Sequence, residues 1–89
     1  MHVSKYDINI FVSMATKNPR NNQIIIRFGY NVRKYRTAKG LTMNELAGLC
    51  DVELGAISTV ERGKVNCTIS TAYAISNALN ISIDKLLEE

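Results

Sequence analysis

The placement of helix-capping residues constrains the fold of this 89-residue chain more than any other feature of its sequence. Asn22 can cap a first helix, and Gly40 can end it in the left-handed conformation that glycine tolerates. Between them, apolar residues recur at spacings of three and four, which is typical of one buried helix face. The inward-facing residues of this helix are Ile24, Ile25, Phe28, Val32 and Tyr35.

Two further helices are predicted on either side of a tight turn at Asp51, a short polar residue that tolerates a positive φ. Thr42 and Glu45 match a capping box, in which each side chain bonds a backbone amide at the helix start. This helix covers residues 41–50, and the next runs from about residue 53 to 62 and closes at Gly63. Their inner faces consist of Leu46, Ala47, Cys50, Ile57 and Val60, with Val52 packed at the turn.

A fourth and a fifth helix follow, capped by Thr68 and Ser82. The inward residues are Ile69, Ala72, Ile75 and Leu79 in the fourth helix, and Ile83, Leu86 and Leu87 in the short fifth one. The predicted fold class is therefore all-α, with a compact five-helix domain over residues 23–89.

Residues 1–22 do not share this helical pattern. In residues 6–14, apolar side chains alternate with others at a period of two, which is typical of a strand. They are Tyr6, Ile8, Ile10, Val12 and Met14. Because the chain offers no second strand candidate, this N-terminal arm either pairs with the same segment of another subunit or is disordered.

Composition excludes several classes of protein. The chain is 46% hydrophobic and 21% charged, which is ordinary for a soluble globular protein. No apolar run approaches the length of a membrane span and no signal peptide opens the chain, so we expect a cytoplasmic protein. Cys50, Cys67 and a single histidine cannot supply a four-ligand metal site within one chain, so we expect buried free thiols, no metal and no cofactor.

Charge is distributed unevenly along the chain. Residues 1–39 carry eight basic side chains and one acidic one, whereas residues 40–89 carry three basic and seven acidic ones. A basic half suits a polyanion such as nucleic acid, and a solvated basic face is the alternative.

The two helices around Asp51 have the spacing of a helix-turn-helix, and four runs around them carry a more specific pattern. The runs cover residues 28–36, 40–47, 57–63 and 78–87. In this order and spacing, the chain resembles the Cro and phage-repressor-like (XRE-type) DNA-binding family. Residues 60–69 are also similar to the controller proteins of restriction-modification systems, although many stand-alone repressors share this run.

The resemblance implies roles for individual residues. Contacts to DNA are expected from Thr42, Met43, Asn44, Glu53, Leu54, Gly55, Ser58, Thr59, Arg62, Lys64 and Asn66. Arg36 and Glu61 are expected to form a structural ion pair between the first and third helices. A homodimer interface is expected at Tyr73, Ala74, Asn77, Ile81 and Leu87.

The expected function is a sequence-specific regulator of transcription that binds double-stranded DNA. The family implies a homodimer on a palindromic operator, with the third helix in the major groove. The leading positions of this helix hold no Gln, Asn or Arg for bidentate bonds to bases, so thymine methyl groups and DNA shape become more important.

The sequence also bears on two other classes of function, an enzyme and a protein-interaction module. No paired carboxylates, nucleophile elbow or glycine-rich phosphate loop occurs, so we do not expect an enzyme. An antitoxin-like or adaptor module is the alternative, in which an apolar surface at Leu49, Leu54, Gly55 and Ala56 binds another protein.

Overall fold

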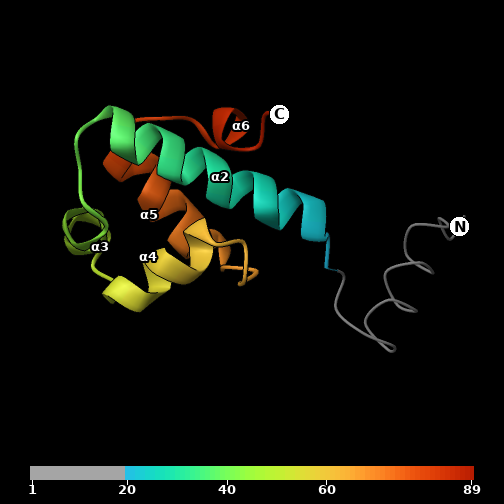
Figure 1. Cartoon of the computed structure of the whole chain (residues 1–89), viewed down its shortest axis with the longest axis horizontal. Helices are drawn as coiled ribbons and strands as arrows, with labels where there is room; N and C mark the ends of the chain where they lie inside the picture. Colours follow the sequence, from blue (N-terminus) through green and yellow to red (C-terminus); the bar gives the residue numbers. More distant parts are fainter. Residues whose placement is uncertain (1–19) are drawn as a thin grey trace, which may run out of the picture.

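The computed structural model describes residues 20–89, and within this range the chain contains five helices and no strand (Figure 1). The helices are α2 (Asn22–Ala38), α3 (Met43–Cys50), α4 (Leu54–Glu61), α5 (Ile69–Leu79) and α6 (Ile83–Leu86). The all-α fold class is confirmed. The predicted arm lies almost entirely outside the described residues, and the division into an arm and a domain stays a prediction.

The long helix α2 crosses the whole domain, with α4, α5 and α6 packed against it (Figure 1). Helices α3 and α4 are joined by a short turn and pack on α5 and α2 respectively. The side chains that lose all or nearly all contact with solvent come from each of the five helices. They are Val32, Leu46, Ile57, Ile75, Leu79 and Leu86.

Capping residues set most helix ends where the sequence predicts them. The Thr42 hydroxyl accepts from Glu45 N at 3.0 Å, and the Glu45 carboxylate accepts from Thr42 N at 2.8 Å, which completes the capping box. Asp51 ends α3 with a φ of 57°. The cap of α2 is Asn21 rather than Asn22, because Asn21 has the extended backbone and its Oδ1 accepts from Ile24 N at 3.0 Å.

Some residues predicted to face inward lie at the surface instead. Ile69 is 87% exposed, although Ile75 and Leu79 of the same helix are fully buried. Each residue advances about 100° around a helix, so two three-residue steps leave Ile69 about 120° away from Ile75. It shares the outer face with Tyr73, four residues later. Ile24 and Ile83 are each 36% exposed.

Helices α2 and α4 approach each other closely at Gly29, which is buried. A Cβ atom at this position would lie 2.1 Å from the Val60 carbonyl oxygen, a distance that real Cβ atoms do not adopt. Glycine therefore lets the backbones of the two helices meet.

The carboxyl end of α6 is held by a buried amide in α2. Asn31 Nδ2 donates to the carbonyl oxygens of Leu86 at 2.9 Å and of Glu88 at 2.7 Å. Arg27 Nη1 adds a longer bond of 3.5 Å to Leu87 O. These carbonyls have no partner within α6, so the amide satisfies groups that the end of a helix otherwise leaves to water.

Candidate nucleic-acid interface

One face of α4 is exposed to solvent near both ends, at Gly55 and Arg62, and half-buried between them, at Ser58 and Thr59. Gly55 lies near the start of this face, and apart from its chain neighbours and its own helix backbone no described atom lies within 4 Å of the position a Cβ would occupy. At helical spacing, Ser58 and Thr59 lie on either side of Gly55, and Arg62 follows one turn later. Glu53 and Leu54 are exposed at the start of this face. The structure thus brings together the residues of this helix that were predicted to contact bases.

The opposite side of α4 is fixed to the core. Ile57 and Val60 are 0% and 2% exposed. Arg36 Nε donates to Glu61 Oε2 at 2.6 Å and Arg36 Nη2 donates to Glu61 Oε1 at 2.9 Å, so the structure pairs these residues in a fork. The hydrogen bond to Glu61 raises the pKa of Arg36 above its usual value. Arg36 Nη1 also donates to Leu41 O at 2.8 Å, so one guanidinium joins α2, the loop before α3, and α4.

The two hydroxyl groups on the open face differ in what they offer a ligand. Thr59 Oγ1 donates to Gly55 O at 2.9 Å and lies 3.1 Å from Ala56 O. A hydroxyl carries one hydrogen, so Thr59 presents a methyl group and a lone pair but no donor. Ser58 forms no side-chain hydrogen bond with the described residues and keeps both donor and acceptor.

Glu53 occupies the cap position of α4 without capping it. Its backbone is extended, yet its carboxylate accepts no bond from the first turn of the helix. The carboxylate remains free to accept a hydrogen bond from an external donor. Leu54, beside it, is 45% exposed.

The start of α3 offers free amides. Of its first amides, Glu45 N and Leu46 N already bond Thr42, whereas Met43 N and Asn44 N have no acceptor among the described residues. Amides at a helix start favour an anion such as a phosphate. Thr42 and Asn44 are exposed beside them, but the Met43 side chain is half-buried against the core.

Basic side chains lie near the start of α3 and the carboxyl end of α4. A shallow hollow between α2, α3 and α4 is lined by Arg33, Arg36, Met43, Ser58, Glu61 and Arg62. Arg33 and Arg62 form no ion pair within the described range. Lys34 and Lys39 are exposed on the same half of α2, and residues 20–39 contain no acidic side chain. Positive charge is therefore free in the carboxyl half of α2 and at the end of α4.

Comparison with known protein families and structures shows which family contains this arrangement of helices. The model of the HTH_3 helix-turn-helix family matches residues 32–86, which include both α3 and α4. The chain belongs to the HTH_3 family. HTH_3 proteins of this XRE type are DNA-binding regulators of transcription and not enzymes.

Several relatives of this HTH_3 chain are control proteins. Control protein C.SmaI of Serratia marcescens is 40% identical over 57 residues, which cover 64% of this chain and 68% of that protein. Control protein C.BamHI of Bacillus amyloliquefaciens is 35% identical over 68 residues, or 75% of this chain and 84% of that protein. The crystal structure of the restriction-modification controller protein C.AhdI from Aeromonas hydrophila matches with a TM-score of 0.67 and 34% identity, over 70% of this chain and 94% of that one. The resemblance to controller proteins is confirmed.

Beyond α4, the remaining residues expected to contact DNA lie in the loop that leads from α4 to α5. Lys64 and Asn66 are both exposed there. Asn66 also lines an apolar groove between this loop, α2 and α6.

The residues expected at a dimer interface lie on α5, at the turn between α5 and α6, and directly after α6. Tyr73 is 62% exposed on the outer face of α5, with Asn77 one turn later. Asn77 and Ile81 line one shallow hollow, whereas Leu87 lines the apolar groove beside α2. Ala74, Ile81 and Leu87 are half-buried.

Two further properties concern the described part of this HTH_3 chain. Among residues 20–89, no group of three or more potential metal ligands lies together. Within the same range, none of the helices combines the length and the hydropathy that crossing a membrane requires.

Proposed function

We propose that this protein binds double-stranded DNA in a sequence-specific manner and regulates transcription as a homodimer on a palindromic operator. Helix α4 enters the major groove, and the start of α3 contacts the phosphate backbone. A regulator bound to DNA acts in the compartment that holds the DNA, so the expected cytoplasmic location is part of this proposal.

The observation that carries the proposal is the open face of α4 beside unpaired positive charge. The face is held outward by two buried apolar residues and the fork between Arg36 and Glu61. The free amides of Met43 and Asn44 and the unpaired Arg33 and Arg62 lie on the elements around it. These groups match the two walls of phosphates that flank a helix in a DNA groove.

The chemistry of α4 suggests how bases are distinguished. The free carboxylate of Glu53 can accept from the amino group of cytosine, and Leu54 can contact the methyl group of thymine. Gly55 permits close approach of the backbone. Thr59 contributes its methyl group, because its hydroxyl hydrogen is bonded within the helix. Phosphates and DNA shape then supply the rest of the binding energy.

The proposed homodimer forms through α5 and the α5–α6 region. Tyr73 is a large aromatic side chain exposed to solvent, as interface anchors tend to be before association. Ile69 lies one turn before it and is exposed as well, which extends the apolar surface. In a two-fold dimer, the two α4 helices would meet half-sites about 34 Å apart.

The proposal is tested by selecting bound duplexes from a random DNA pool with the wild-type chain and two variants. The wild type should enrich a palindrome. Thr59→Ser removes the methyl group and should reduce the preference at one base pair of each half-site by about 0.8 kcal/mol, the value of one buried methyl-sized group. Thr59→Val keeps the methyl group and should retain that preference. Absence of an enriched palindrome, or the opposite ranking of the variants, would contradict the proposed reading mode.

Subunit association is tested separately by sedimentation. The wild type should sediment as a dimer, and Tyr73→Ala should shift it toward the monomer. Asn44→Ala provides a matched control at an exposed helical position outside the proposed interface. A monomeric wild type would remove the dimer from the proposal without affecting the DNA-binding part.

The alternative is a protein-interaction module, and one observation favours it. Leu49 at the end of α3 is 61% exposed and Leu54 at the start of α4 is 45% exposed. Exposed apolar residues on consecutive elements suit a protein partner. A DNA binder must lose affinity steeply as salt rises, so a chain that shows no salt-dependent binding to random duplex would favour this alternative.

Among regulators of this kind, control of a restriction-modification system is the role that the similar control proteins suggest. The selected operator provides the test, because such a role requires that site to lie upstream of the restriction or methylation gene.

A further inference from the structure

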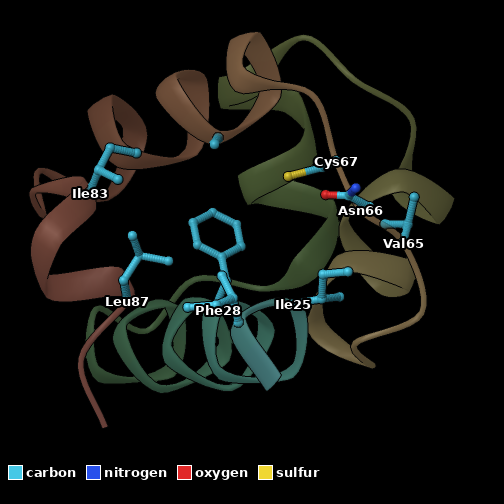
Figure 2. Close-up of a pocket in the computed structure, with 9 residues that line it drawn as sticks. Ile25, Phe28, Val65, Asn66, Cys67, Ile83 and Leu87 are labelled. Carbon is cyan, nitrogen blue, oxygen red and sulfur yellow. The ribbon is translucent and has the colours of Figure 1, made fainter. Parts of the chain in front are cut away.

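Helix α2 presents two large side chains to solvent that the core does not use. Ile26 is 58% exposed and Tyr30 is 68% exposed, one turn apart on the same face. Phe28, between them in sequence, lies about 200° around the helix from each and points into the apolar groove (Figure 2). Arg33 follows Tyr30 by three residues and is exposed as well. Ile26, Tyr30 and Arg33 thus form one exposed line along the helix, the α2 strip.

The α2 strip runs beside the carboxyl end of α4. A Cβ atom at Gly63 would lie 3.0 Å from Ile26 Cγ1, so the backbone that follows α4 packs against the first residue of the strip. At the other end of the strip, Arg33 shares a shallow hollow with Ser58 and Arg62. The strip is therefore continuous with the open face of α4, which carries the proposed contacts to bases.

The polar groups of the strip have no partner within the described domain. The Tyr30 hydroxyl donates to no described residue, and Arg33 neither donates a side-chain hydrogen bond nor forms an ion pair there. Arg62 uses only its Nε, in a long bond of 3.4 Å to Ser58 O, and keeps its two terminal nitrogens free. Residues 20–44 contain no acidic side chain. One phenolic hydroxyl and two guanidinium groups thus remain available to a negatively charged acceptor.

We propose that the α2 strip binds the phosphate backbone of a DNA duplex, through a hydrogen bond from the Tyr30 hydroxyl and through the charge of Arg33. This inference rests on the proposed function, because it extends the DNA contacts of α4 onto α2. Tyrosine hydroxyls and arginine side chains are among the groups that contact phosphates in protein–DNA complexes. Such contacts fix the orientation of a protein on the duplex and carry no direct sequence information. Tyr30 and Arg33 therefore contribute affinity and orientation to the complex, and no base preference.

A protein partner is the competing occupant of the strip, because two exposed large side chains on one helix face suit such a partner too. Charge favours DNA over a protein. Arg33 and Arg62 lie at one end of the strip and Lys64 lies beyond the other end, next to Gly63. All three cations are exposed and have no ion pair among the described residues. A surface with cations at both ends is complementary to a polyanion.

Tyr30→Phe removes only the hydroxyl and tests the hydrogen bond. The affinity of the full-length chain is measured at low salt for two duplexes, one with the palindrome selected by the wild type and one of random sequence. Loss of a hydrogen bond to a charged acceptor should weaken binding to both duplexes by the same factor, on the order of tenfold per subunit. Tyr35→Phe is the matched control, since Tyr35 lies about 140° around α2 from Tyr30 and its hydroxyl donates to no described residue. This variant should bind both duplexes as the wild type does.

Arg33→Gln tests the charge through the salt dependence of binding. The plot of log affinity against log salt concentration should become shallower by about 0.9 per subunit, because each neutralised phosphate contributes that amount. Tyr30→Phe should leave this slope unchanged, since it removes no charge. Lys85→Gln is the matched control, because Lys85 is exposed and has no ion pair among the described residues, but belongs to α6. Helix α6 packs on the opposite side of α2 from α4 (Figure 1), so the slope should stay at its wild-type value.

The possible outcomes separate this inference from the proposed function. If the wild type enriches a palindrome while Tyr30→Phe and Arg33→Gln bind both duplexes like the wild type, the inference alone is overturned and the strip is left to a protein partner. A loss confined to the selected duplex would indicate contacts to bases and overturn the inference too. A wild type that binds neither duplex at low salt would overturn the proposed function together with this inference. Tyr30 and Arg33 are exposed, so both variants should keep the Tm of the wild type, and unfolding then does not account for weaker binding.

Discussion

Replacing Gly29 by alanine tests whether the close crossing of α2 and α4 determines how α4 is presented. Gly29 lies in the middle of α2, against the carbonyl oxygens of Val60 and Glu61 at the carboxyl end of α4. An added Cβ would lie 2.1 Å from the Val60 oxygen, whereas real Cβ atoms essentially never come within 3.0 Å. The two helices must therefore separate by about 1 Å.

The loss of stability in Gly29→Ala depends on how easily the clashing atoms of α4 can move. The clashing atoms belong to the backbone, and the Val60 oxygen accepts a bond from Gly63 N at 3.0 Å, so it cannot turn aside freely. Overpacking typically costs about 1–3 kcal/mol, and a backbone clash belongs at the upper end. Alanine recovers about 1 kcal/mol through its helix propensity. We expect a net loss of about 2 kcal/mol, or about 8–16 °C in Tm for a domain of this size.

Thermal unfolding followed by circular dichroism measures this loss, with Gly48→Ala as the matched control. Gly48 is also a helical glycine, but no described atom lies within 4 Å of the position its Cβ would occupy. Alanine there should raise stability by about 0.5–1 kcal/mol. If Gly29→Ala melts as high as Gly48→Ala, the two helices can separate without cost, and the reasoning is refuted.

Three other substitutions or measurements probe the interior. Arg36→Met leaves Glu61 buried without its partner and should lower the free energy of unfolding, measured in urea, by about 3–5 kcal/mol. The double variant Arg36→Met, Glu61→Leu should recover most of that loss. If the single and the double variant lose the same free energy, the two residues are not coupled. Asn31→Asp replaces an amide donor by a carboxylate facing two carbonyl oxygens, and should lower the free energy of unfolding by about 1–3 kcal/mol at neutral pH. An unchanged urea midpoint would show that the two hydrogen bonds from Asn31 do not stabilise the end of α6. Burial raises the pKa of the Cys50 and Cys67 thiols, so less thiolate is present at a given pH. The pH at which alkylation accelerates should therefore be higher in the native chain than in the urea-unfolded chain, and coinciding profiles would contradict this.

The helix boundaries could be predicted because the signals that set them are local. A capping box needs two side chains three residues apart, and a left-handed end needs a residue such as Asp51 that accepts a positive φ. Two adjacent residues that can both cap a helix leave its first residue uncertain by one position. Asn21 and Asn22 are the same residue type, and the sequence did not show which of them has the extended backbone of the cap.

Tertiary features could not be predicted in this way. Asn31 donates hydrogen bonds to residues 55 and 57 positions later in the chain, so no short sequence pattern predicts these bonds. The role of Gly29 depends on where α4 crosses α2, and the groove beside α2 combines four separate segments. Ile69 was placed inward because its spacing to Ala72 is that of a helix face, but the drift of three-residue steps carries it to the surface.

The open face of α4 explains why the function of such a helix is easier to predict than its target. Ile57, Val60 and Glu61 each have a partner inside the domain, so their types limit where the helix can sit. The side chain of Thr59 and the position of Gly55 have no partner in another helix of the described domain, so the fold does not determine what they contact. The structure narrows the choice in one respect, since the hydroxyl hydrogen of Thr59 is bonded to the backbone of its own helix. In the proposed complex with DNA, base discrimination by α4 would therefore depend on a methyl group, a serine hydroxyl and the approach of a bare backbone, and most of the affinity would come from charges that meet phosphates.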